Sequence, residues 1–225
     1  MKPDRKALLP AILDALVFVS SMLGIVAILT DWRFTNPNPR PTDAPFFASF
    51  TGLSNLTVGI VALSCFLFRL IKKKQTLPYP LFLIKLYFAA MILITFLVTA
   101  CYLAPSTGDQ GYRLYINGGL FNHLFTPVLA ILAFLVGEPK MTSRFRDCLF
   151  VSIPMGAYAI FYMIRAYTHI PPQGGLDLYY DIYGFARWGI GVTFALLFAF
   201  IALAIGLAFM LLAIHKAIKK DRIKP

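Results

Sequence analysis

Two short polar clusters, each set within a long apolar run, are the parts of this sequence whose residue types suit chemistry. Their members are Thr51, Ser54 and Asn55 in the first cluster and Asn122, His123 and Thr126 in the second. Residues three or four apart share one face of a helix, so each cluster forms a polar face. Because polar groups are costly in hydrocarbon, we expect the two faces to turn inward and lie against each other.

A threonine hydroxyl and a neutral imidazole suit nucleophilic catalysis. The imidazole of His123 would take the hydroxyl proton while the oxygen of Thr51 attacks an acyl carbon. The resulting oxyanion needs hydrogen-bond donors. The candidates for that role, or for support of the site, are Ser54, Asn55, Asn122 and Thr126. Buried Thr, Asn and His side chains also join packed membrane helices, so the residues alone leave catalysis and helix packing both open.

The composition is that of an integral membrane protein. Of the 225 residues 59% are hydrophobic and only 14% are charged, and the mean hydropathy is +0.72. The net charge of +11 comes from basic clusters between apolar runs, where orientation in the bilayer accounts for it, so nucleic acid is not an expected partner. Cys65, Cys101 and Cys148 lack the spacing of metal ligands, so we expect neither a metal site nor a disulfide framework.

Six apolar segments are long enough to cross a bilayer, since a helical span takes about 20 residues. The sequence therefore predicts an all-α fold: one polytopic domain, residues 1–225, that forms a bundle of six transmembrane helices. The predicted spans are 8–30, 46–70, 79–103, 118–137, 148–167 and 188–214.

The distribution of Lys and Arg predicts the orientation of the bundle. Sixteen of these residues fall on the side that holds both chain ends and five on the other side, which favours cytoplasmic N and C termini. Thr51 and His123 then lie near the outer ends of the second and fourth spans, so the site would face the extracytoplasmic leaflet. The expected location is a bacterial cytoplasmic membrane.

The sequence also allows predictions for several charged residues, histidines and a proline in or next to the spans. Asp14 is expected to meet Lys85 or a helix end, although a proton relay is an alternative, and Lys85 can also extend to the headgroups. Arg165 suits a lipid carboxylate, the interface, or an ion pair with Asp177 or Asp181. Pro127 cannot donate to the carbonyl of His123, which predicts a kink there. His169 and His215 are expected to be solvated.

The stretches SFTGLSNL and NHLFTPVL resemble the two signature segments of the androgen-induced and androgen-dependent TFPI-regulating protein family, most closely its bacterial six-pass members. The resemblance implies an intramembrane threonine hydrolase that cleaves esters of hydroxy fatty acids with fatty acids, with Thr51 as nucleophile and His123 as its histidine. The fifth span is similar too, and the residues that carry this likeness are Pro154, Tyr158, Tyr162 and Arg165. The loop LYYDIYGF departs from the family pattern because it lacks a proline.

The predicted function is therefore hydrolysis of a lipid ester through an acyl-enzyme, in a pocket open toward the outer leaflet. Tyr158, Tyr162 and Arg165 would bind the substrate, and no cofactor is required. Two alternatives stay open: a small transporter or structural membrane protein without catalytic activity, and an acyltransferase. The acyl chain lengths, the ester position and the oligomeric state do not follow from the sequence.

Overall fold

The computed structural model describes residues 5–30, 45–106, 108–139, 141, 143–169 and 180–221, with the backbone alone at 5–7, 45, 220 and 221. Within these ranges the chain forms helices and short connections, and no strand. Asp177, one of the expected partners of Arg165, lies outside the described residues, as does the first part of the loop LYYDIYGF.

Among the described residues, six helical segments are long and apolar enough to cross a membrane, which confirms the predicted bundle. They are Leu8–Leu29, Phe50–Lys72, Tyr79–Ser106, Gly118–Gly137, Phe145–Thr168 and Ile190–Lys219. The first is carried by α1 (Arg5–Leu29), the second by α3 (Phe50–Lys72) and the sixth by α9 (Ile190–Asp221). Each predicted span coincides with one of these segments to within a few residues.

The other three spans are composite helices. The third joins α4 (Tyr79–Val98) to the π-turn η1 (Thr99–Leu103) and α5 (Ala104–Ser106). The fourth runs through α6 (Gly118–Leu120), the π-turn η3 (Phe121–Phe125), α7 (Thr126–Leu132) and a further π-turn, η4 (Ala133–Gly137). The fifth begins as the 3₁₀ helix η5 (Phe145–Val151) and continues as α8 (Ser152–Thr168).

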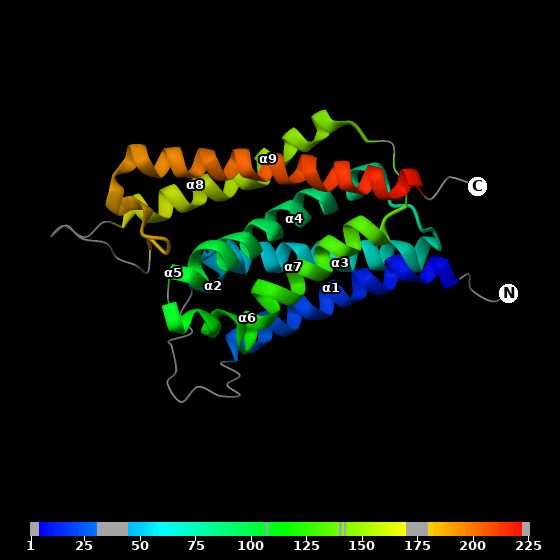
Figure 1. Cartoon of the computed structure of the whole chain (residues 1–225), viewed down its shortest axis with the longest axis horizontal. Helices are drawn as coiled ribbons and strands as arrows, with labels where there is room; N and C mark the ends of the chain where they lie inside the picture. The colour runs from blue at the N-terminus through cyan, green and yellow to red at the C-terminus, as the bar shows by residue number, and fades with distance from the viewer. Residues whose placement is uncertain are drawn as a thin grey trace.

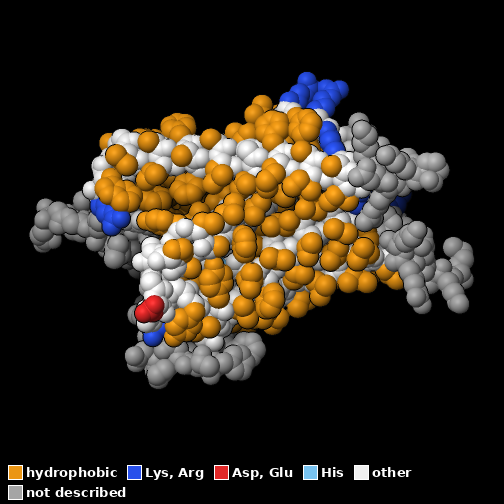
Figure 2. Space-filling view, in the orientation of Figure 1, with side chains coloured by type: hydrophobic (Ala, Val, Ile, Leu, Met, Phe, Trp, Pro, Cys, Tyr) orange, Lys and Arg blue, Asp and Glu red, His pale blue; other side chains and the backbone are white. Residues whose placement is uncertain are grey.

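Both chain ends lie at the same end of the bundle, as an even number of spans requires (Figure 1). We call this the terminus end. The opposite end, called the site end below, holds the short helix α2 (Pro45–Ala48) and the start of α3. It also holds two 3₁₀ helices, η2 (Gly108–Tyr115) and η6 (Phe185–Trp188), which lie in the loops before the fourth and sixth spans. Figure 2 shows a side of the bundle covered mostly by hydrophobic side chains, the surface expected of a protein that faces lipid.

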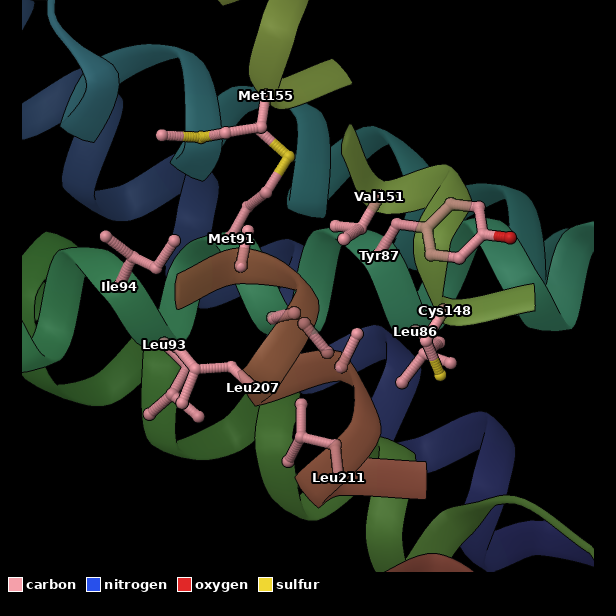
Figure 3. Packing of buried hydrophobic residues seen from close by; sticks show 14 of the residues in the cluster. Leu86, Tyr87, Met91, Leu93, Ile94, Cys148, Val151, Met155, Leu207 and Leu211 are labelled. Carbon is pink, nitrogen blue, oxygen red and sulfur yellow. The ribbon is translucent and has the colours of Figure 1, made fainter. Parts of the chain in front are cut away.

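Helix α4 forms the centre of the bundle because it is apolar on every side. It packs against α3, α7 and α9, and eleven of its twenty residues are buried. Figure 3 shows part of this core, in which Met91 and Leu93 of α4 gather with Leu207 of α9 and Met155 of α8. The central position of α4 leaves α1, α3 and the fourth span together on one side of it, and this group carries the two polar clusters.

The second span starts later than predicted because the helix is interrupted at Ser49. The hydroxyl of Ser49 accepts a hydrogen bond from the backbone N–H of Gly52 at 3.0 Å and donates to the carbonyl of Phe46 at 2.6 Å, which ends α2 and caps α3. Gly52 is required at this contact, since a Cβ there would lie 1.8 Å from the carbonyl oxygen of Phe46. The interruption places Thr51 in the first turn of α3.

Candidate functional site

Thr51 is the second residue of α3 and is half-buried at the site end. Its backbone carbonyl accepts hydrogen bonds from Ser54 and Asn55. Its side-chain hydroxyl forms no hydrogen bond with any residue that the structure describes. The first turn of a helix carries a partial positive charge, which favours negative charge on an oxygen held there. The Thr51 hydroxyl is thus uncommitted and lies where an alkoxide or oxyanion is stabilised.

His123 lies in the middle of the π-turn η3, and its ring is held by the backbone of η2. The Nδ1 atom is 2.7 Å from the carbonyl oxygen of Leu114. Because a carbonyl can only accept, Nδ1 must carry the proton in the neutral ring and Nε2 must be the unprotonated nitrogen. No described residue bonds Nε2. This is the tautomer that a general base requires, and a backbone carbonyl orients it in place of a carboxylate.

The two polar clusters meet at Asn55 and Asn122, as the sequence predicted. The side-chain nitrogen of Asn55 donates to the carbonyl of Thr51 at 2.9 Å and to the carbonyl of Asn122 at 3.1 Å. The amide group of Asn55 therefore joins the backbone carbonyl of Thr51 to that of Asn122, the residue before His123. No hydrogen bond between the hydroxyl of Thr51 and the ring of His123 is present among the described residues.

The other polar residues of the clusters hold helices together. Ser54 pairs with Thr95 of α4 at 2.9 Å, and Thr126 pairs with Ser20 of α1 at 2.8 Å. The amide nitrogen of Asn122 lies 3.4 Å from the carbonyl of Gly24, also in α1. Because both N–H groups of Asn55 are directed at carbonyls, this residue supports the site and has no N–H left for an oxyanion.

The kink expected at Pro127 stays a prediction, but the turn before this residue is the π-turn η3. The N–H of Thr126 bonds to the carbonyl of Phe121, five residues back, and α7 follows with Pro127 near its start. An extra residue in a helical turn shifts the side chains that precede it and is frequent at functional sites. Here the shifted residues are those of η3, including His123.

Tyr158 and Tyr162 of α8 lie at the site end, and their hydroxyls have protein partners. Tyr158 donates to the carbonyl of Ala48 at 3.2 Å and packs edge-on against Phe50, with ring centroids 5.1 Å apart. Tyr162 donates to Asp181, whose carboxylate also accepts the backbone N–H groups of Phe185 and Ala186. These contacts attach the loop before the sixth span to the start of α3.

The guanidinium of Arg165 lies 5.1 Å from the ring centroid of Tyr180. His169 is exposed, as expected, and stacks on the same ring at 3.8 Å. Arg165 therefore belongs to the aromatic surface at the site end, where interfacial side chains are expected in a membrane protein.

Tyr183 is a residue of the site that the sequence interpretation missed. Its hydroxyl oxygen accepts the backbone N–H of Phe50 at 2.7 Å, directly beside Thr51. Burial raises the pKa of the Tyr183 phenol, while hydrogen bonds from Tyr158 and from the backbone of Phe50 and Thr51 act in the opposite direction. With its pKa raised, the phenol keeps its proton at neutral pH. The only hint in the sequence was the concentration of tyrosines in this loop.

Gly119 lies against the carbonyl that orients His123, so a methyl group added at residue 119 should disturb this orientation. A Cβ at residue 119 would lie 2.5 Å from the carbonyl oxygen of Leu114 and 3.7 Å from Nδ1 of His123. Gly119→Ala is therefore expected to displace that carbonyl. For a reaction in which His123 acts as the base, it should reduce turnover by about 10²-fold, because the histidine loses its fixed tautomer. The check is kcat in lipid nanodiscs. Gly156→Ala is the control, since nothing lies within 4 Å of a Cβ there. Equal rates for the two variants would contradict the role of Leu114.

A second polar centre lies at the terminus end. The sequence predicted only one of its ion pairs, that of Asp14 with Lys85. We call it the charge tetrad: Asp14 of α1, Arg69 of α3, Lys85 of α4 and Glu138, which follows η4. Arg69 forms ion pairs with Asp14 at 3.0 Å and with Glu138 at 2.5 Å. Lys85 forms ion pairs with the same two carboxylates, the one with Glu138 at 2.5 Å. The predicted pairing of Asp14 with Lys85 is confirmed. The expectation that Lys85 extends to the headgroups is wrong, because it is 6% exposed and has two carboxylates as partners.

His215 also differs from the prediction, since it is 1% exposed instead of solvated. Its ring packs with Phe82 and Phe134, at centroid distances of 5.7 and 5.3 Å. Aromatic packing across α4, η4 and α9 draws this part of α9 into the core. The helix also runs past the predicted end of the span, so His215 is inside the span and not beyond it.

A small cavity of about 10 Å³, the space of roughly one water, adjoins the tetrad. Asp14 and Lys85 line it together with apolar residues of α1, α3, α4 and the fourth span. In the described part of the chain, no group of three or more His, Cys, Asp or Glu could hold a metal ion. Cys65 and Cys148 are buried free thiols, and Cys101 is an exposed one.

In the part of the chain that the structure describes, the fold and the two polar centres define an integral membrane protein with six helical spans, in which a Thr hydroxyl that bonds no described residue and an oriented histidine lie near one end of the bundle. Comparisons with family models, with curated proteins and with solved structures find no match to this chain.

Proposed function

We propose that the protein is an intramembrane hydrolase that cleaves a lipid ester, with Thr51 as nucleophile and His123 as general base. The observation that carries the proposal is the neutral tautomer of His123, fixed by the carbonyl of Leu114, in a turn whose backbone is joined to that of Thr51 by the amide of Asn55. Nε2 of His123 and the hydroxyl of Thr51 bond no described residue, so both groups are available for this reaction.

The reaction follows from these groups in two half-reactions. The oxygen of Thr51 adds to the ester carbonyl carbon while Nε2 of His123 takes the hydroxyl proton, and the carbonyl π electrons move onto the oxygen. Collapse of the adduct breaks the bond to the leaving alcohol, which receives the proton from His123. The acyl group is then bound to Thr51. A water attacks this acyl-enzyme with His123 again as base, and the fatty acid leaves as Thr51 regains its proton.

The substrate class that we propose is an ester of a hydroxy fatty acid with a fatty acid, in keeping with the resemblance of SFTGLSNL and NHLFTPVL to the threonine hydrolase family. Such a molecule needs apolar walls for its two chains, which the helices supply. Arg165, Tyr158 and Tyr162 stand at the same end of the bundle, and Arg165 suits the free carboxylate of the substrate. No cofactor takes part in this scheme.

Covalent trapping tests the proposal. The purified protein in lipid nanodiscs would be treated with a long-chain fluorophosphonate, digested, and analysed by tandem mass spectrometry. We expect a single phosphonate adduct on Thr51, and equal amounts of fatty acid and hydroxy fatty acid when the ester replaces the probe. An adduct on Ser54, or none, would refute Thr51 as the nucleophile.

The charge tetrad supports a second candidate, a small transporter, because ionisable groups inside a membrane often mark solute or proton pathways. In that case reconstituted vesicles should show solute flux that depends on Asp14 or on Arg165. Absence of flux across a broad solute screen, together with ester turnover, would exclude this class. Acyl transfer shares the first half-reaction and is recognised by an acylated product that forms only when an acceptor alcohol is added.

A further inference from the structure

The proposed reaction creates an oxyanion, and the predicted donors are largely committed to other partners. Both N–H groups of Asn55 bond carbonyls, and one of the two N–H groups of Asn122 points at the carbonyl of Gly24. The hydroxyl of Ser54 lies between Thr95 and the carbonyl of Thr51. The oxyanion that forms on the substrate carbonyl oxygen when Thr51 attacks is therefore served best by a further donor at the site end.

Tyr183 lies in the right place for this. Its phenol oxygen receives the N–H of Phe50 at 2.7 Å, so the phenol group is in contact with the first turn of α3, where Thr51 is the next residue. Its ring is packed between Tyr162 and Phe185, at centroid distances of 5.7 and 5.4 Å, and this fixes its direction. The residue as a whole is half-buried.

No described residue accepts the proton of this phenol at less than 3.5 Å. The Tyr158 hydroxyl lies at that distance, and its single proton goes either to the carbonyl of Ala48 at 3.2 Å or to Tyr183. Asp181 is occupied by Tyr162 and by two backbone N–H groups. The phenol oxygen accepts from a backbone N–H, which polarises the O–H bond and makes it a better donor.

We propose that Tyr183 is a catalytic residue that donates its phenol proton in a hydrogen bond to the oxyanion formed when Thr51 attacks the ester. This inference rests on the proposed function. The loop before the sixth span then has a chemical role, and the contacts of Tyr158, Tyr162 and Asp181 hold Tyr183 over the start of α3. The hydrogen bond strengthens as negative charge forms on the substrate oxygen, so it contributes to the transition state more than to substrate binding.

Tyr183→Phe tests the inference because it keeps the ring and removes only the hydroxyl. We expect kcat for the ester to fall about 10²- to 10³-fold with little change in KM, the effect of removing one oxyanion donor. Binding of a trifluoromethyl ketone lipid, which forms a tetrahedral adduct with a hydroxyl nucleophile, should weaken by the same factor. Binding of a non-reactive ether analogue of the substrate should not change.

Tyr167→Phe is the matched control, since it also removes a hydroxyl from an interhelical hydrogen bond at the site end, here the 2.9 Å contact with Thr193. It is expected to keep wild-type kcat. If Tyr183→Phe weakens the ketone and the ether equally, or lowers kcat no more than Tyr167→Phe does, Tyr183 only supports the structure and the inference is wrong. The proposed function fails by a different result, namely ester turnover that survives Thr51→Ala.

Discussion

Thr51→Ala and His123→Ala are each expected to lower the turnover of the ester by roughly 10⁴- to 10⁶-fold, because nucleophile and base act as one unit. For the same reason the double variant should be no slower than the slower single variant. Both substitutions should also abolish fluorophosphonate labelling. Turnover would be measured by release of fatty acid in nanodiscs, with the amount of folded protein checked by size-exclusion chromatography.

Thr51→Ser is the matched control for this series, because it keeps a hydroxyl at the same place in the first turn of α3. It should retain labelling and a substantial part of the activity. Folding is not expected to suffer in Thr51→Ala, since the Thr51 hydroxyl bonds no described residue. His123→Ala also removes the hydrogen bond from Nδ1 to the carbonyl of Leu114, so its folded amount is compared with that of Thr51→Ala. Labelling that persists in Thr51→Ala, or activity losses that multiply in the double variant, would contradict the shared mechanism.

Breaking the charge tetrad is expected to cause the largest loss of stability. Asp14→Asn or Glu138→Gln leaves two buried cations with a single carboxylate, which costs about 3–5 kcal/mol in buried ion pairs. All four side chains are at most 7% exposed, so water cannot replace the missing charge. The measurement is the free energy of unfolding in mixed detergent micelles, or the loss of monomeric protein on heating.

Charge balance provides the control for this prediction. The double variant Asp14→Asn with Lys85→Met removes one charge of each sign and should recover much of the stability lost in Asp14→Asn alone. Lys72→Met, at an exposed position near the end of α3, should change stability by no more than about 0.5 kcal/mol. If the charge-balanced double variant is less stable than Asp14→Asn, the tetrad does not act through charge pairing.

The tetrad also limits how the bundle can assemble. Three of its side chains come from the first three spans, and Glu138 directly follows the fourth. The fifth and sixth spans join the core mainly through apolar contacts such as those in Figure 3. Spans one to four are thereby fixed in register relative to one another. The polar clusters around Thr51 and His123 lie on the second and fourth of these spans, so the same register brings Asn55 to Asn122.

The sequence by itself determined the membrane class, the six spans and the meeting of the two polar clusters. Each follows from a local cost: an apolar run of a given length must be buried in lipid, and a polar face within it must turn toward another polar face. The pairing of Asp14 with Lys85 could be predicted for the same reason, because a charge inside the membrane requires a counter-charge.

Only the tertiary structure decided how the candidate site is built. The carbonyl of Leu114 that orients His123, the phenol of Tyr183 beside Thr51, and the pairing of Arg69 with Glu138 all join groups whose types give no local signal. The carbonyl of Leu114 cannot be singled out, because every residue has a backbone carbonyl. Tyr183 cannot either, because tyrosines in outer loops are typical of any membrane interface. Arg69 precedes a run of lysines, which favours an exposed position. Which of them becomes a partner depends on how the helices pack around α4, and that packing sums many weak apolar contacts that no short segment encodes.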